Sequence, residues 1–123
     1  MNPDHSPCIK RCLRTMLFTL AALSSASTFA ASFDCAHARL PDEKAVCASR
    51  QLSELDVEMS VRYQMLTGLV AMGTRGDMQD QQQTWLKSRH ACGESKSCLL
   101  DLYRQRIAKL KEQYAQLARR GPF

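Results

Sequence analysis

The stretch from Trp85 to Tyr103, WLKSRHACGESKSCLLDLY, decides the fold of this chain. It predicts the end of one helix, a tight loop and the start of the next helix, with a cysteine on each side of the loop. Gly93 follows Cys92 where a residue with positive φ closes a helix, because glycine has no Cβ to oppose that conformation. Ser97 offers its hydroxyl to the free amides of a helix that begins at Cys98. The stretch therefore predicts a helical hairpin, which a bridge between the two cysteines would staple at its junction.

Residues 1–30 have the pattern of a secretory signal peptide. Three basic residues precede an apolar run, 16–23, that is too short for a permanent membrane span, and a tract of small residues follows. Thr28 and Ala30 fit the small-x-small rule, which places the cleavage after Ala30. A slightly earlier cut and an uncleaved membrane anchor are the alternatives. We therefore expect an exported protein, periplasmic or secreted, that is not inserted stably in a membrane after cleavage.

Export leaves one small domain, residues 31–120, and a short C-terminal tail, residues 121–123. A chain of this length can bury one small core. The removed segment contains three basic residues and Asp4, so the net charge falls from +5 to +3. This mild positive charge is interleaved with acidic residues along the helices, which is typical of a solvated surface. It gives no reason to expect a nucleic acid partner.

Four cysteines remain in the mature chain, and an even number in a small exported domain indicates disulfides. Four cysteines permit three pairings. We favour the local pairing, Cys35–Cys47 and Cys92–Cys98, because each pair brackets one predicted turn. Each bridge closes a short loop, so each is expected to contribute less than the ~3 kcal/mol of a loop of about 15 residues.

A metal centre is the alternative use of these cysteines. The pairs Cys35-Ala-His37 and His90-Ala-Cys92 supply two cysteines and two histidines. However, one residue separates the ligands of each pair, whereas zinc sites use two to four, and export favours bridges. The sequence also has no Cys-x-x-Cys, nucleophile elbow or glycine-rich phosphate loop. We therefore predict no metal, no cofactor and no catalytic residue.

Apolar residues recur every three or four positions in two long segments, and no segment alternates as a strand does. The first set is Leu52, Leu55, Met59, Tyr63, Leu66 and Val70. The second, a heptad-like seam, is Leu100, Tyr103, Ile107, Leu110, Tyr114 and Leu117. Across the hairpin, Trp85 and Leu86 should face Leu100 and Tyr103. The pattern predicts an all-α fold, a small disulfide-stapled bundle of three main helices with a short N-terminal helical preface. A free-standing coiled coil is the alternative for the last helix.

Helix boundaries follow from capping and breaking residues. Pro41 suits the first turn of a short helix that ends near Ala48. Ser49 or Ser53 caps the next helix, and the segment 73–76, Gly-Thr-Arg-Gly, should end it. The third helix is expected to open at one of two aspartates, Asp77 and Asp80.

Asp56 and Arg89 each lie beside the apolar stripe of their helix. A charge at the edge of a core needs a partner. We predict that the two side chains form a structural polar pair, or that Arg89 pairs with another helix carboxylate. In the alternative, both side chains point to water.

Two parts of the sequence resemble the sequence pattern of a known family. The segment from Phe33 to Asp56, FDCAHARLPDEKAVCASRQLSELD, is similar to the opening of the lysozyme inhibitor LprI-like domain family. That family's later half supplies Q-x-x-W-L-x-x-R-x-x-C-G and C-L-x-x-x-Y-x-x-R-I-x-x-L. The matching positions are Gln82, Trp85, Leu86, Arg89, Cys92, Gly93, Cys98, Leu99, Tyr103, Arg106, Ile107 and Leu110. This chain has Ser49-Arg50 where members of the family frequently have Asp-Pro. We therefore expect a less abrupt break between the first two helices.

The resemblance implies a small helical, disulfide-bonded envelope protein, usually of Gram-negative bacteria, with some relatives associated with lysozyme inhibition. The predicted function is a periplasmic binding protein that inhibits a lysozyme-type muramidase by steric occlusion. The hairpin loop is the expected contact surface, because a pre-ordered loop loses little entropy on binding. Its candidate residues are Arg89, His90, Glu94 and Lys96. The alternative is an envelope protein–protein adaptor or immunity-type module without lysozyme activity.

Charge argues against rapid encounter with a basic lysozyme, because a protein of net charge +3 gains no long-range attraction to it. A local acidic patch would compensate. The candidates for that patch are Asp42, Glu43, Glu54 and Glu58.

Overall fold

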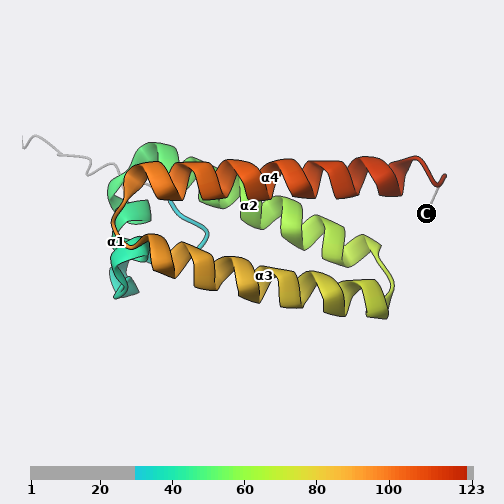
Figure 1. Cartoon of the computed structure of the whole chain (residues 1–123), viewed down its shortest axis with the longest axis horizontal. Coiled ribbons are helices and arrows are strands. Elements are labelled where there is room, and N and C mark those ends of the chain that lie inside the picture. The colour runs from blue at the N-terminus through green and yellow to red at the C-terminus, as the bar shows by residue number, and fades with distance from the viewer. Residues whose placement is uncertain (1–29, 122–123) are drawn as a thin grey trace, which may run out of the picture.

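A computed structural model describes residues 30–121 of the chain, and the predicted signal peptide lies almost entirely outside this range. The described elements are a 3-10 turn, η1, and four α-helices. Their bounds are η1 Cys35–His37, α1 Pro41–Ala48, α2 Arg50–Leu69, α3 Met72–Cys92 and α4 Lys96–Ala118. The three long helices form a bundle, and α1 lies at the end where α3 passes to α4 (Figure 1). The prediction of an all-α three-helix bundle with a helical preface is confirmed.

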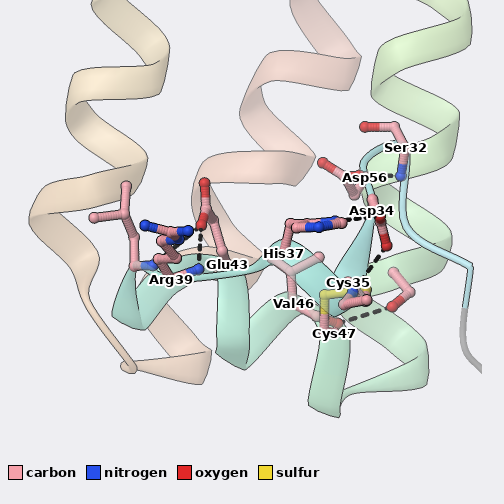
Figure 2. Close-up of a disulfide and its surroundings, with 12 residues drawn as sticks. Ser32, Asp34, Cys35, His37, Arg39, Glu43, Val46, Cys47 and Asp56 are labelled. Atoms are coloured by element: carbon pink, nitrogen blue, oxygen red, sulfur yellow. Dashed lines mark hydrogen bonds and ion pairs between the residues drawn. A yellow bond between two sulfur atoms is a disulfide. The ribbon is translucent and has the colours of Figure 1, made fainter.

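The start of α1 is built as its sequence predicts. Pro41 occupies the first turn, where its missing N–H costs nothing. The carboxylate of Glu43 turns back and accepts hydrogen bonds from the amides of Arg39 and Leu40, at 2.9 and 3.1 Å (Figure 2). These backbone hydrogen bonds lower the pKa of Glu43. The carboxylate therefore satisfies amides that the helix itself leaves free.

A single residue, Ser49, separates α1 from α2. Its hydroxyl accepts from the amide of Leu52, so it caps α2. Ser53, the other candidate cap, is buried and donates instead to the carbonyl of Val46 at 2.8 Å. The two helices are thereby tied together at a sharp break.

The boundary between α2 and α3 differs from the prediction. The helix α2 ends at Leu69 and α3 begins at Met72, so Gly73 and Gly76 lie inside α3. Neither glycine has a positive φ. A glycine in a helix costs only about 1 kcal/mol relative to alanine, which tertiary packing of α3 can outweigh. Asp77 and Asp80 therefore lie within the helix and do not open it.

The hairpin between α3 and α4 is confirmed, with a small shift of its second boundary. Gly93 closes α3 with φ +55°, as its position predicts. The helix α4 begins at Lys96, not at Cys98, and Ser95 is its N-cap in place of Ser97. The carbonyl of Ser95 already accepts the first helical hydrogen bond of α4, from Leu99 at 3.0 Å. Only three residues connect the two helices.

The core lies between the three long helices and is closed at one end by α1. Its fully or nearly buried members are Val46, Leu52, Met59, Leu66, Met78, Trp85, Leu99, Tyr103, Ile107 and Leu110. The rings of Trp85 and Tyr103 meet edge to face at 5.1 Å, which confirms the predicted contact across the hairpin. Leu99, absent from the predicted seam, is fully buried because it precedes Tyr103 by four residues and shares its face. Tyr114, predicted in that seam, is mostly exposed.

Both predicted disulfides form, Cys35–Cys47 and Cys92–Cys98. The first ties η1 to the end of α1 (Figure 2), and the second joins the two helices of the hairpin. The segments that carry the two bridges, η1 with α1 and the α3–α4 turn, lie at the same end of the bundle (Figure 1). We call residues 35–50 and 90–98 the disulfide end. Within residues 30–121, no helix is long and apolar enough to cross a membrane.

Candidate functional site

A buried polar cluster joins all four helices beside the disulfide end. It consists of Asp42 from α1, Asp56 from α2, Arg89 from α3 and Tyr103 from α4, all of them buried. Arg89 Nε donates to Asp42 Oδ2 at 2.7 Å, and its Nη1 lies 3.8 Å from Asp56 Oδ1. The Tyr103 hydroxyl donates to Asp56 Oδ1 at 2.8 Å. One arginine thus stands between two carboxylates that come from different helices.

The closest partner of Arg89 is a residue that the sequence did not single out for this role. Arg89 and Asp56 approach each other, but the short hydrogen bond goes to Asp42. An aspartate in the first turn of a helix normally faces water and complements the helix dipole, so Asp42 gave no signal of burial. Only the contact between α1 and α3 reveals it. Asp56 is supported instead by Tyr103 and by the backbone amide of Ser32, which donates at 2.7 Å (Figure 2).

The electrostatics of the cluster favour its charged form. Burial alone would raise the pKa of Asp42, but hydrogen bonds from His90 and Arg89 outweigh it and lower that pKa. Burial alone would lower the pKa of Arg89, but Tyr103 and Asp42 raise it. Burial, with the charge of Asp56, raises the pKa of Tyr103, which keeps its hydroxyl as a donor. The single positive charge of Arg89 therefore offsets the two carboxylates in part, and hydrogen bonds from His90 and Tyr103 give them further support.

The residues just after the predicted cleavage position cover this cluster. The Arg89 guanidinium carbon lies 5.5 Å from the centre of the Phe33 ring and 5.9 Å from that of Trp85. Aromatic faces at this distance stabilise a cation. Together with the Ser32 amide on Asp56, they close the cluster from the N-terminal side.

The residues predicted for the contact loop do not all lie on its surface. Arg89 is buried within α3, because its side chain pairs with the two core carboxylates, so it is not available to a partner. His90 also belongs to α3 and is partly exposed. Glu94 lies in the turn and Lys96 begins α4, and both are exposed. The accessible part of the predicted set is therefore His90, Glu94 and Lys96.

The hairpin turn lies next to the junction of α1 and α2. The two segments border an open groove of about 950 Å³. The groove is lined by Lys44, Ala45, Ala48, Ser49, Arg50, Gln51, Leu52, Glu54, Glu94 and Lys96. The candidate surface is thus wider than the loop and includes one face of α1.

The predicted acidic patch does not form. Asp42 is fully buried, because it pairs with Arg89. Glu54 pairs with Arg50 at 2.7 Å, and Glu58 pairs with Arg62 and Lys111 at 2.8 and 3.2 Å. The hydrogen bonds from those two cations lower the pKa of Glu58. These acidic side chains are compensated locally and provide no net negative surface.

The cysteines of the alternative metal centre are not available as thiolate ligands. Cys35 and Cys92 are oxidised in the two bridges. In the part of the chain that is described, no group of three or more His, Cys, Asp or Glu side chains could hold a metal ion. His37 instead contacts the exposed carboxylate of Asp34 (Figure 2).

Residues 35–110 match the family model described as Lysozyme inhibitor LprI. The chain belongs to this family. The matched region of this LprI-family protein contains both disulfides, the complete buried cluster and the hairpin turn. It ends within α4, at Leu110, which is also the last fully buried residue of that helix. Among curated proteins and solved structures, none matches the chain.

Proposed function

We propose that this LprI-family protein inhibits a lysozyme-type muramidase in the periplasm by steric occlusion of its glycan cleft. The observation that carries the proposal is the family match over residues 35–110. The cleft of such an enzyme must remain open to a polymeric glycan, so a protein seated in it blocks turnover without any chemistry of its own.

The disulfide end is the surface best built for this contact. Two bridges and the buried cluster fix η1, α1 and the α3–α4 turn relative to each other. A surface that is ordered before binding loses little conformational entropy when the complex forms. The exposed side chains it presents include Lys44, Glu94 and Lys96.

The charge of this surface suits a cleft better than it suits the outside of a basic lysozyme. Glycoside hydrolases place two carboxyl groups beside the scissile bond. Exposed lysines at the disulfide end can complement those groups at short range, whereas a protein of net positive charge gains no long-range steering. We therefore expect inhibition that depends on local contacts more than on the association rate.

The test is residual muramidase activity during titration with the oxidised mature protein, residues 31–123, against several lysozyme types. A reduced and alkylated sample is the control for the bridges. A matched pair of variants locates the contact, namely Lys96→Glu at the disulfide end and Lys109→Glu in the middle of the same helix. Saturable inhibition that is weakened by Lys96→Glu and kept by Lys109→Glu supports the proposal. A folded, oxidised protein that inhibits none of the lysozymes contradicts it.

One observation favours the second candidate, an envelope adaptor or immunity-type module. Four exposed apolar residues form a row along α2, namely Val57, Val61, Met65 and Leu69. A four-residue spacing makes such a row a continuous ridge of the kind that packs against another helix. Under this candidate, Val61→Asp abolishes co-purification with an envelope protein, and no lysozyme is affected by the wild-type chain.

A further inference from the structure

His90 and Asp42 form a pair that differs from an ordinary surface ion pair. His90 lies in the last turn of α3 with its side chain 41% exposed, while that of Asp42 is 1% exposed. Its Nδ1 is 3.0 Å from Asp42 Oδ2. The same oxygen accepts the 2.7 Å hydrogen bond from Arg89 Nε. A buried arginine therefore fixes a buried carboxylate, and that carboxylate orients an exposed imidazole.

This arrangement decides which nitrogen of His90 faces a partner. An ionised carboxylate only accepts hydrogen bonds, so Nδ1 of His90 must carry the hydrogen. The remaining nitrogen, Nε2, has no hydrogen bond partner among residues 30–121. It is an acceptor when the imidazole is neutral and a donor when the imidazole is charged.

The protein contains a natural comparison at the same end. His37 also contacts an aspartate through Nδ1, but its side chain is 79% exposed and that of Asp34 is 62% exposed. Among residues 30–121, no buried side chain holds Asp34 as Arg89 holds Asp42. When both side chains of an ion pair are exposed to water, the pair holds neither of them firmly in one orientation. The fixed imidazole of the disulfide end is therefore His90.

We propose that His90, positioned by Asp42, recognises a carboxyl group inside the cleft of the partner enzyme. This inference rests on the proposed function and names the chemistry of its contact. A carboxyl group complements the imidazole in either state, because a protonated acid donates to neutral Nε2 and a carboxylate accepts from the charged form. Glycan-cleaving clefts contain one protonated carboxylic acid and one ionised carboxylate.

Inhibition titrations of the oxidised protein test the contact. We expect His90→Ala to raise the half-inhibitory concentration about tenfold or more, the effect of losing one hydrogen bond to a charged group. His90→Gln, whose amide reaches the position of Nε2, should recover part of that loss. His37→Ala, the matched control, should stay within about twofold of the wild type. If the wild type inhibits and His90→Ala inhibits equally well, the inference is overturned while the proposed function stands. If the wild type inhibits no muramidase, the proposed function fails and the inference falls with it.

The positioning role of Asp42 has a separate readout that needs no partner. Nitrogen-15 NMR of the imidazole, well above the ordinary imidazole pKa of about 6.5, reports its neutral tautomer. We expect the Nδ1–H tautomer of His90 in the wild type and loss of that preference in Asp42→Asn. A wild-type protein with the hydrogen on Nε2 would overturn the positioning argument even if inhibition is observed.

Discussion

The two ends of the bundle are built in different ways. At the disulfide end, two bridges and a cluster of buried charges join all four helices. At the far end, formed by the α2–α3 turn and the last turns of α4, the described residues contain no disulfide and no buried ion pair, and Met72 is 85% exposed. A hollow of about 350 Å³ lies there, and two of its lining residues, Gln81 and Gln113, have a buried Oε1 without a partner in the described part of the chain.

Under the proposed function, this difference corresponds to a division of roles. Covalent bonds and buried ion pairs fix positions, and a fixed surface is what recognition of a cleft requires. Opening of the far end breaks neither the two bridges nor the buried ion pairs, so we expect its helix ends to fray first.

Removing Arg89 should break the disulfide end. Arg89→Ala leaves Asp42 and Asp56 buried without their shared cation, and removing one partner of a buried pair costs about 3–5 kcal/mol. Urea unfolding of the oxidised protein measures the change. Arg75→Ala is the far-end control, because Arg75 is exposed and its contact, at 3.2 Å, is to the carbonyl of Val70. A loss of similar size in both variants would remove the contrast between the ends.

Removing the bridges one at a time should give a smaller and graded effect. The cysteines of Cys35–Cys47 are 12 residues apart and those of Cys92–Cys98 are 6 apart. Loop-closure entropy therefore predicts that the first bridge stabilises more, with both in the range of about 2–3 kcal/mol. Paired Cys→Ser variants in thermal unfolding check the order. A reversed order would show that native-state contacts, not loop length, decide the contribution.

Acid should weaken the disulfide end through Asp42. Its pKa in the folded protein lies below the ordinary value of 3.8, so near that value the unfolded chain binds more protons than the folded one. The stabilisation is complete above the ordinary value and is lost as the pH falls through the lowered one. The free energies of unfolding of the wild type and Asp42→Asn should therefore converge as the pH falls.

Two glycine substitutions should have opposite signs. Gly76→Ala lies inside α3, and a Cβ there meets nothing within 4 Å, so it should stabilise by about 0.5–1 kcal/mol. Gly93→Ala forces a side chain onto a residue with φ +55° and should destabilise by about 1–2 kcal/mol. Thermal unfolding of both variants measures the pair. Two changes of the same sign would contradict the assigned helix boundaries.

Sequence reasoning reached the architecture because the features that decide it are local. Helical periodicity, the position of Gly93 and the spacing of the cysteines all concern neighbours in the chain. Sequence reasoning failed at Gly73 and Gly76, because α3 runs through both glycines despite their low helix propensity. It also failed at Asp42, whose partners His90 and Arg89 lie 48 and 47 residues away.

The same reason explains what was predicted of the candidate site. The exposure of Glu94 and Lys96 follows from their place in the tight turn and at the first residue of α4. The burial of Arg89 follows only from α1 crossing the end of the bundle, which no periodicity reveals. The groove beside the turn lies between two segments that are far apart in sequence, so it could be identified only from the structure.

Amide hydrogen exchange with and without a muramidase tests most directly whether the disulfide end is the recognition surface. The mature oxidised protein would be compared free and in the presence of excess enzyme. With the enzyme present, we predict slower exchange in residues 41–50 and 90–98 than in the free protein, and unchanged exchange around the α2–α3 turn. Protection confined to the exposed ridge of α2 or to the far end would contradict it.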